Sequence, residues 1–244
     1  MTWLLGLDFA DLTAADAAAR IAGRSADANF AYIVTPNADH LARLARLPGL
    51  APLYEDAALR LLDSRVVARA ARLMGLPAPP VATGSDVTAL LLRMHLHPGE
   101  RITVVGVAPP HLASLCTRLR LAPPAHCNPP CGFDEDAAAF QTTVDFVRAN
   151  PARFIFLAVG SPRQEWLAHA IAAAGDARGT GLCIGASLEF LAGARRRAPR
   201  WMQRAGLEWL WRLCTEPRRL ARRYLLEDWR VLAALWRARR FPDR

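Results

Sequence analysis

Two hydrophobic patterns alternate along most of the chain. Short apolar runs, typical of strands buried on both faces of a sheet, occur at residues 3–7, 31–34, 58–62, 101–107, 153–159 and 181–186. Between them, apolar residues return every three or four positions, as in helices that bury one face, at residues 13–22, 40–46, 66–74, 84–95, 109–120, 134–150 and 162–174. This alternation predicts an α/β fold whose mostly parallel sheet is covered by helices on both faces.

Local signals refine these elements. Ser85 or Asp86 is expected to cap the helix that starts at residue 84, and the proline-rich residues 123–133 are expected to form a loop. The chain has 244 residues, of which 52% are apolar, so it can build one large domain or a domain with an appendage.

The sequence argues against a membrane-spanning protein, a secreted protein and a protein built on disulfides or zinc. No apolar run reaches the roughly 18 residues that a membrane-spanning helix needs. The N-terminus lacks the basic segment and cleavage site of a secretory signal, so we expect a cytoplasmic protein. The five cysteines show neither a disulfide framework nor zinc-site spacing, and we expect reduced thiols.

The net charge lies in the last fifth of the chain. Residues 195–244 carry 15 arginines against 5 acidic residues, whereas the residues before them carry 16 basic and 17 acidic side chains. Aromatic residues are interleaved with these arginines: Trp201, Trp209, Trp211, Tyr224, Trp229 and Trp236. This mixture is typical of a protein that meets an anionic, partly apolar surface, and a membrane is the partner we favour. Nucleic acid is the rival partner, since charge alone does not separate the two.

The spacing in this tail predicts an amphipathic helix after Pro217. One stripe carries arginines and a separate stripe is apolar; they are Arg219, Arg223, Arg230 and Arg237, and Leu225, Trp229, Leu232 and Trp236. A basic helix with tryptophans is typical of one that lies in a membrane interface. Packing against its own domain and contact with a second copy are the two alternatives.

Polar side chains follow the predicted strands. In parallel sheets, ligands bind beyond the carboxyl ends of the strands, so these residues together predict a site. They are Thr35, Asn37, Asp63, Ser161, Arg163, Gln164, Glu165, Ser187 and Glu189. The same positions also need polar caps when nothing binds there.

The most informative short motif is residues 160–165, Gly-Ser-Pro-Arg-Gln-Glu. Gly160 and Ser161 let a ligand approach the backbone, and the helix that follows offers free N–H groups to a phosphate. Arg163, Gln164 and Glu165 supply a cation and hydrogen-bond partners for a nucleotide. A capped helix after a buried strand explains the motif equally well.

Asp63 follows a buried strand, where a carboxylate can serve as a general base toward a hydroxyl. On the residues alone, a cap for the helix at 64–74 is the favoured reading. Thr35 and Asn37 have the same ambiguity, because Thr-Pro-Asn also forms turns.

Other motifs favour structural readings. Asp134-Glu135-Asp136 has a form that holds divalent metals, but acidic residues also favour a helix start, which we prefer. Gly106 lacks the partner glycines of a dinucleotide fingerprint. His95 and His97 have no further metal ligand nearby. We therefore expect no metal and no cofactor.

Several of these segments together resemble one protein family. They are Thr35-Pro36-Asn37, Asp63 ahead of VVARAARLMG, Gly84-Ser85-Asp86, Pro129-Pro130-x-Gly132-Phe133, residues 160–165, and FLAGARRRAPRWMQRAGLEWLWRLCTEPRRLARRYL. Their order resembles the WecG/TagA/CpsF family of bacterial glycosyltransferases, and the similarity covers about residues 3–226.

The resemblance implies an inverting, metal-independent transferase that moves a sugar from a UDP-sugar to a sugar on a polyprenyl diphosphate. It implies a Rossmann-like α/β domain in residues 1–192 and a helical appendage in residues 193–244 that closes over the site and touches the membrane. The expected location is therefore the cytoplasmic side of the cell membrane, with peripheral association. Nucleic acid is not an expected partner, and the oligomeric state stays open, with a homo-oligomer among the options.

The resemblance also assigns roles to residues. Asp63 is the expected base, with Thr35 and Asn37 in the same pocket. The substrate-binding set comprises Thr35, Asn37, Gly84, Ser85, Asp86, Gly160, Ser161, Arg163, Gln164 and Glu165. Arg212, Arg219 and Arg222 match arginines that meet the diphosphate groups. The transferred sugar stays open among N-acetylmannosamine, its uronic acid and glucose.

Three positions depart from the family pattern: Asp39 precedes His40 where glutamate is usual, and two others lie at strand ends. Glycine commonly follows the catalytic aspartate, where this chain has Ser64, and paired glycines usually end the strand that here ends in Gly106-Val107. The last two departures suggest an alternative function, a catalytically inactive protein of the same fold that binds membranes or nucleic acid.

Overall fold

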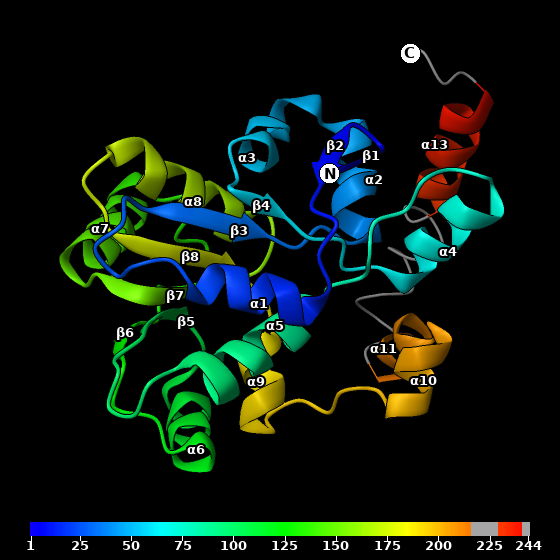
Figure 1. The fold of residues 1–244 in the computed structure, drawn as a ribbon. Helices are drawn as coiled ribbons and strands as arrows, with labels where there is room; N and C mark the ends of the chain where they lie inside the picture. The colour runs from blue at the N-terminus through cyan, green and yellow to red at the C-terminus, as the bar shows by residue number, and fades with distance from the viewer. Residues whose placement is uncertain (216–228, 241–244) are drawn as a thin grey trace.

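A computed structural model describes residues 1–215 and 229–240. Figure 1 shows a twisted sheet with helices on both of its faces. Within the described residues this sheet has six parallel strands in the order β4-β3-β8-β7-β5-β6. In chain order the strands are β3 (Ala31–Val34), β4 (Leu59–Arg60), β5 (Thr103–Gly106), β6 (Ala125–Cys127), β7 (Ala152–Ala158) and β8 (Gly179–Cys183). The predicted α/β, Rossmann-like fold is confirmed.

The central strands bury both faces, as their unbroken apolar runs predict. Phe156 of β7 pairs with Leu182 of β8, and Tyr32 of β3 pairs with Gly181 on the other side of β8. Gly181 permits this arrangement because an added Cβ would lie 2.5 Å from the Phe30 ring. Alternate residues of the strands therefore enter two separate apolar cores, one on each face of the sheet.

The helices divide between these two cores. One face is covered by α2 (Ala38–Arg46), α3 (Pro52–Glu55), α4 (Arg65–Leu73), α7 (Ala137–Ala149), α8 (Arg163–Ala174) and α13 (Trp229–Arg240). The other is covered by α1 (Ala14–Ala22), α5 (Gly84–Leu90), the π-helical turn η2 (Leu91–His95), α6 (Pro109–Leu119) and α9 (Ser187–Ala192). Within residues 1–215 and 229–240, the other helices are the 3-10 turn η1 (Pro48–Leu50), α10 (Arg200–Ala205) and α11 (Glu208–Thr215).

Three local expectations were wrong. The N-terminal run is an antiparallel hairpin of β1 (Thr2–Leu4) and β2 (Leu7–Phe9), because Leu5 and Gly6 turn the chain with positive φ. Thr83 caps α5, since its hydroxyl accepts a hydrogen bond from the Asp86 N–H, so neither Ser85 nor Asp86 is the cap. The proline-rich loop contains the edge strand β6.

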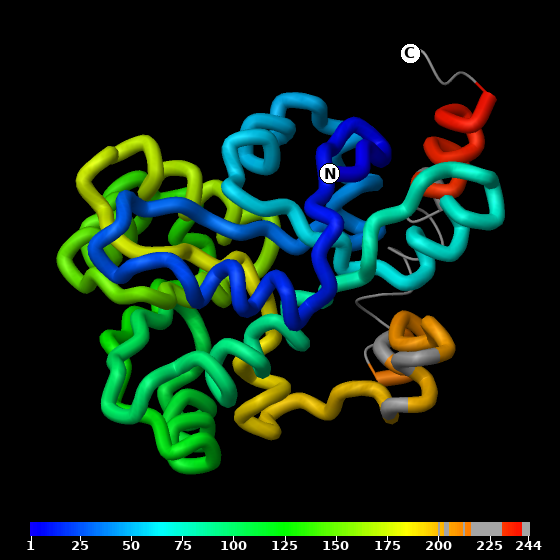
Figure 2. Tube along the Cα trace, in the orientation of Figure 1, coloured from blue at the N-terminus to red at the C-terminus, as the bar shows by residue number. Residues whose placement is uncertain are grey.

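The C-terminal helices lie beside α4. Figure 2 follows the chain from α9 through residues 193–199 to α10 and α11. Arg69 of α4 donates a hydrogen bond to the carbonyl of Ala205 at the end of α10. The predicted division at residue 192 stays a prediction.

Helix α13 has two different apolar surfaces. Val231 and Leu235 are buried in the same core as the sheet, where the helix meets α2 and α4. Leu232 and Trp236, which belong to the predicted apolar stripe, are exposed. Packing against its own domain is thus confirmed for one face of α13, while Leu232 and Trp236 of the predicted stripe keep exposed surface. The stripe positions before Trp229 lie outside the described residues.

Candidate active site

A cavity of about 710 Å³ opens at the carboxyl edge of the sheet. Its walls come from the ends of β3, β4, β7 and β8 and from α11 and α13. Nine of the predicted residues line it: Thr35, Asn37, Asp63, Ser85, Gly160, Ser161, Gln164, Ser187 and Glu189. Strand ends that are far apart in the sequence therefore meet here, as expected for a parallel sheet.

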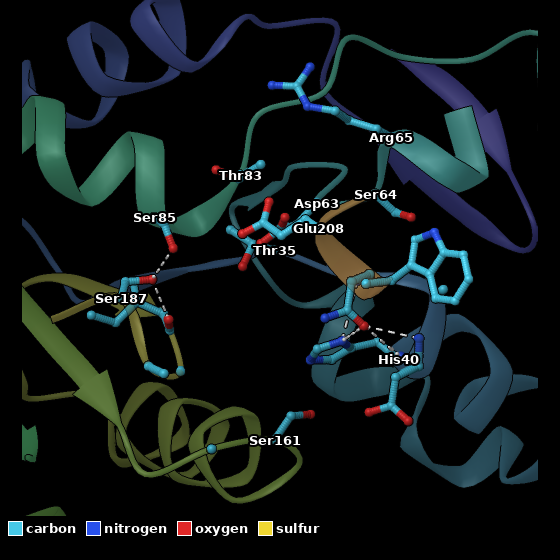
Figure 3. Close-up of a pocket in the computed structure, with 18 of the residues that line it drawn as sticks. Thr35, His40, Asp63, Ser64, Arg65, Thr83, Ser85, Ser161, Ser187 and Glu208 are labelled. Carbon is cyan, nitrogen blue, oxygen red and sulfur yellow. Dashed lines mark hydrogen bonds between the residues drawn. The ribbon is translucent and has the colours of Figure 1, made fainter. Parts of the chain in front are cut away.

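Asp63 projects toward the middle of this cavity, close to Thr35 in Figure 3. Its Oδ2 accepts a hydrogen bond from the Gly84 N–H at 3.1 Å. The helix cap is Ser64 instead, whose hydroxyl accepts from the Val67 N–H. The favoured reading of Asp63 as the helix cap was wrong, and its side chain lines the cavity.

The Ser64 departure is accommodated by the backbone. Ser64 has φ −153°, an extended conformation that any residue adopts, so glycine is not required there. At the second departure Val107 has φ 68°, the left-handed region that favours glycine. The His126 Nε2 atom lies 3.0 Å from the carbonyl oxygens of both Gly106 and Val107 and helps to hold this turn.

Gly84 acts through its backbone rather than as part of the cavity lining. An added Cβ would lie 2.9 Å from Thr35 Oγ1, so a larger residue would push against this side chain. Ser85 does line the cavity, and its hydroxyl lies 3.2 Å from that of Ser187.

Asn37 is both a helix cap and a cavity residue. Its Oδ1 accepts hydrogen bonds from the backbone N–H groups of Asp39 and His40. The His40 ring closes this capping box, with Nδ1 at 2.8 Å from the same oxygen. Asn37 therefore has both of its predicted roles, a structural one in the turn and a place in the pocket. The capping box also fixes the positions of Asn37 and His40 at the cavity wall.

The loop at residues 160–165 divides its side chains between the cavity and the interior. Ser161 accepts a hydrogen bond from Arg43 at 2.9 Å, and both residues line the cavity. Gln164 lines it too, with Oε1 held by the Gly185 N–H at 2.9 Å. Arg163 points away and pairs with Asp134 at 3.0 Å, and Glu165 is buried behind the wall. Neither of these two lines the cavity.

Asp86 also lies outside the lining, because Arg197 stands in front of it. Arg197 Nη1 donates to Asp86 Oδ1 at 2.7 Å, Nη2 to Thr83 Oγ1 at 3.3 Å, and Nε to Glu208 Oε1 at 3.3 Å. Burial acts to raise the pKa of Asp86, but the hydrogen bond and charge of Arg197 outweigh it and hold the pKa below its usual value. Arg197 thus joins the start of the C-terminal region to α5 and α11.

Sequence reasoning missed several residues of the cavity. They are His40, Arg43, Arg65, Arg195, Arg197 and Glu208. The run Arg195-Arg196-Arg197 shows that this segment is basic. The sequence does not indicate which of the three guanidinium groups faces the cavity. Arg43 follows Asp39 at helical spacing and pairs with it at 2.8 Å, a signal that indicates a helix surface rather than a site. The cluster of arginines makes the cavity suited to an anionic ligand.

The acidic motif at residues 134–136 serves structure. Asp136 caps α7, so its helix-start reading is confirmed, with the helix beginning at Ala137. In the part of the chain that the structure describes, no three His, Cys, Asp or Glu side chains gather as a metal site.

The three arginines expected at the diphosphate cannot be placed. Arg212 belongs to α11, but its side chain lies outside the described residues, as do Arg219 and Arg222. Over residues 1–215 and 229–240, no helix combines the length and apolar character that crossing a membrane requires.

Comparison with known proteins gives two findings. A family model described as "Glycosyl transferase WecG/TagA/CpsF family" matches residues 2–244. A relative from Bacillus spizizenii, the N-acetylglucosaminyldiphosphoundecaprenol N-acetyl-beta-D-mannosaminyltransferase, is 26% identical over 193 residues, which cover 79% of this chain and 74% of the relative.

Proposed function

Because this chain belongs to the WecG/TagA/CpsF family of glycosyl transferases, we propose that it transfers N-acetylmannosamine from a UDP-sugar to a polyprenyl-diphosphate-linked N-acetylglucosamine. The name of the Bacillus spizizenii relative supports this choice among the three sugars considered above. The catalytic domain is residues 1–192, and residues 193–244 form an appendage that serves the acceptor.

The observation that carries the proposal is the setting of Asp63. Its carboxylate accepts a hydrogen bond from the Gly84 N–H, is not the cap of α4, and lines a cavity that other strand ends also line. We assign it the role of general base. As the acceptor oxygen forms its bond to the anomeric carbon, the bond from that carbon to the UDP oxygen breaks on the opposite face. The acceptor proton passes to Asp63, and the configuration inverts.

Arginines supply the charge that the leaving UDP requires. Arg43 and Arg197 line the cavity, and each also donates hydrogen bonds that fix its orientation. Permanently charged guanidinium groups stabilise the growing negative charge on the diphosphate without a metal ion. Arg212, Arg219 and Arg222 are proposed to meet the diphosphate of the acceptor.

A direct experiment tests this function. The purified protein is incubated with a short-chain polyprenyl-diphosphate N-acetylglucosamine and a panel of UDP-sugars, and UDP release is measured. Release with UDP-N-acetylmannosamine well above all other donors supports the proposal. Release with none of the donors, or equally without acceptor, contradicts it.

We also propose that the protein binds the cytoplasmic face of the membrane peripherally. Exposed apolar side chains gather on the C-terminal helices: Trp201, Trp209, Leu210, Leu232 and Trp236. The Arg240 guanidinium lies 5.1 Å from the Trp236 ring centre, so a cation accompanies this aromatic residue. Apolar rings beside arginines suit the boundary between anionic headgroups and acyl chains.

Replacing Trp236 by serine is expected to lower binding to anionic liposomes several-fold. Its side chain is exposed and does not line the cavity, so the fold and the site should persist, while apolar area available to the membrane is lost. Flotation with liposomes measures the change, and Trp166→Ser, an exposed tryptophan on α8, is the matched control. An equal fall in the control, or no fall in Trp236→Ser, would count against membrane contact through α13.

A further inference from the structure

A buried carboxylate lies directly behind the cavity wall. Glu165 is 1% exposed and does not line the cavity, although its neighbour Gln164 does. Burial of a charge is strongly unfavourable unless other groups compensate it. Glu165 is next to a cavity residue in the chain but does not reach the cavity itself. We therefore look for a role in which it acts on its neighbours rather than on a ligand.

Glu165 connects three loops that form the cavity. Its Oε1 accepts a hydrogen bond from Gln164 Nε2 at 2.8 Å, within the loop after β7. Gln164 Oε1 in turn accepts from the Gly185 N–H at 2.9 Å, in the loop after β8. The same Glu165 oxygen lies 3.7 Å from His40 Nε2, and His40 caps α2 together with Asn37, after β3. One carboxylate thus orients side chains at three strand ends.

The charge of Glu165 follows from its neighbours. Burial acts to raise the pKa of Glu165, but His40, Gln164 and Ser161 outweigh it, so the pKa lies below its usual value and the group is ionised near neutral pH. On the other side of the His40 ring, Nδ1 accepts a hydrogen bond from the Asn37 backbone N–H at 3.3 Å. Tyr32, Tyr54 and Cys183 also face Glu165, and burial raises the pKa of each, so they stay neutral.

We propose that Glu165 and His40 form a positioning pair that holds Gln164 and Asn37 in the orientation that binds the nucleotide sugar. This inference rests on the proposed function for the identity of that ligand. Glu165 itself touches no substrate. Its negative charge keeps the Gln164 amide turned so that the side chain bridges to Gly185, and His40 transmits the same restraint to the cap of α2.

The decisive variant is Glu165→Gln, which keeps the size of the side chain and removes its charge. Binding of UDP is measured by calorimetry and donor KM and kcat by UDP release. We expect the Kd for UDP and the donor KM to rise about tenfold, the effect of losing hydrogen bonds to a charged group, with kcat changed by less than about threefold. Glu100→Gln, which breaks the ion pair of Glu100 with Arg153 away from the cavity, is the matched control.

A second variant, His40→Gln, removes the imidazole that lies between Glu165 and the cap of α2. It should raise the Kd for UDP and the donor KM, but by less than Glu165→Gln does, because the bridge from Gln164 to Gly185 remains. The kcat should again change by less than about threefold, a split between KM and kcat that a general loss of folding would not produce.

Several results would overturn the pair. They are an unchanged Kd for UDP in Glu165→Gln, an equal rise in Glu100→Gln, or an unchanged Kd for UDP in His40→Gln. If Glu165→Gln does not fold, the Kd for UDP of His40→Gln decides. If UDP binding weakens as expected but the unmodified protein transfers no sugar, the proposed function is wrong while the positioning pair stands.

Discussion

Replacing Asp63 by asparagine is expected to reduce the rate of sugar transfer by about 10²- to 10⁴-fold, the range that general base catalysis contributes. Asparagine has the same shape, and its carbonyl oxygen can still accept the hydrogen bond from the Gly84 N–H. It cannot accept the proton of the acceptor hydroxyl. UDP release at saturating substrates measures kcat, and calorimetry should show donor binding within about twofold of the unmodified protein.

Ser64→Ala is the control for this variant. It removes the cap of α4 one residue away and should lower the free energy of unfolding by about 1 kcal/mol, while transfer continues. If Asp63→Asn turned over at the unmodified rate, or if Ser64→Ala lost transfer to the same degree, the base would have to be sought elsewhere in the cavity.

Arg197→Ala is expected to have the second-largest effect, a fall in kcat/KM of about 10- to 100-fold. Arg197 lines the cavity and also joins Asp86 of α5 to Glu208 of α11. Without it Asp86 and Glu208 lose this cation, and α11 loses its link through Arg197 to α5. We expect the free energy of unfolding to fall by about 1.5–3 kcal/mol, the usual contribution of a hydrogen bond to a charged group.

The pH dependence of this loss gives a separate check. The pKa of Asp86 is lowered in the folded protein, so the stabilisation is present above the ordinary aspartate pKa of about 3.9 and is lost as pH falls through the folded value. Denaturant unfolding should therefore show a smaller difference between Arg197→Ala and the unmodified protein at acidic pH. Arg148→Ala, which also leaves two carboxylates but on a distant surface, should change transfer little.

The elements of the fold were largely predictable, because strands buried on both faces have unbroken apolar runs. The location of the site followed from the same reasoning, since parallel strands end at one edge. The direction of individual side chains did not follow. Arg163 and Gln164 are adjacent in the chain, yet one pairs with Asp134 outside the cavity and the other lines it. Only the first turn of α8 decides between them.

The sequence also failed to identify which residues cap the helices. Asp63 and Ser64 are both good caps, and the sequence contains nothing that selects one of them. The structure shows Ser64 in that role. The same competition made Ser85 and Asp86 look like caps when Thr83 performs this function. Long-range partners such as Gly84 for Asp63 are set by the sheet, which local patterns do not describe.

The burial of Val231 and Leu235 in the main core limits how the enzyme can be trimmed for study. Cutting the chain before α13 to obtain a readily purified fragment would leave a void against α2, the helix whose first turn carries Asn37 and His40. Such a fragment would show altered sugar-nucleotide affinity for reasons unrelated to lipid attachment. Assays of surface attachment are therefore better built on outward-facing point substitutions than on shortened chains.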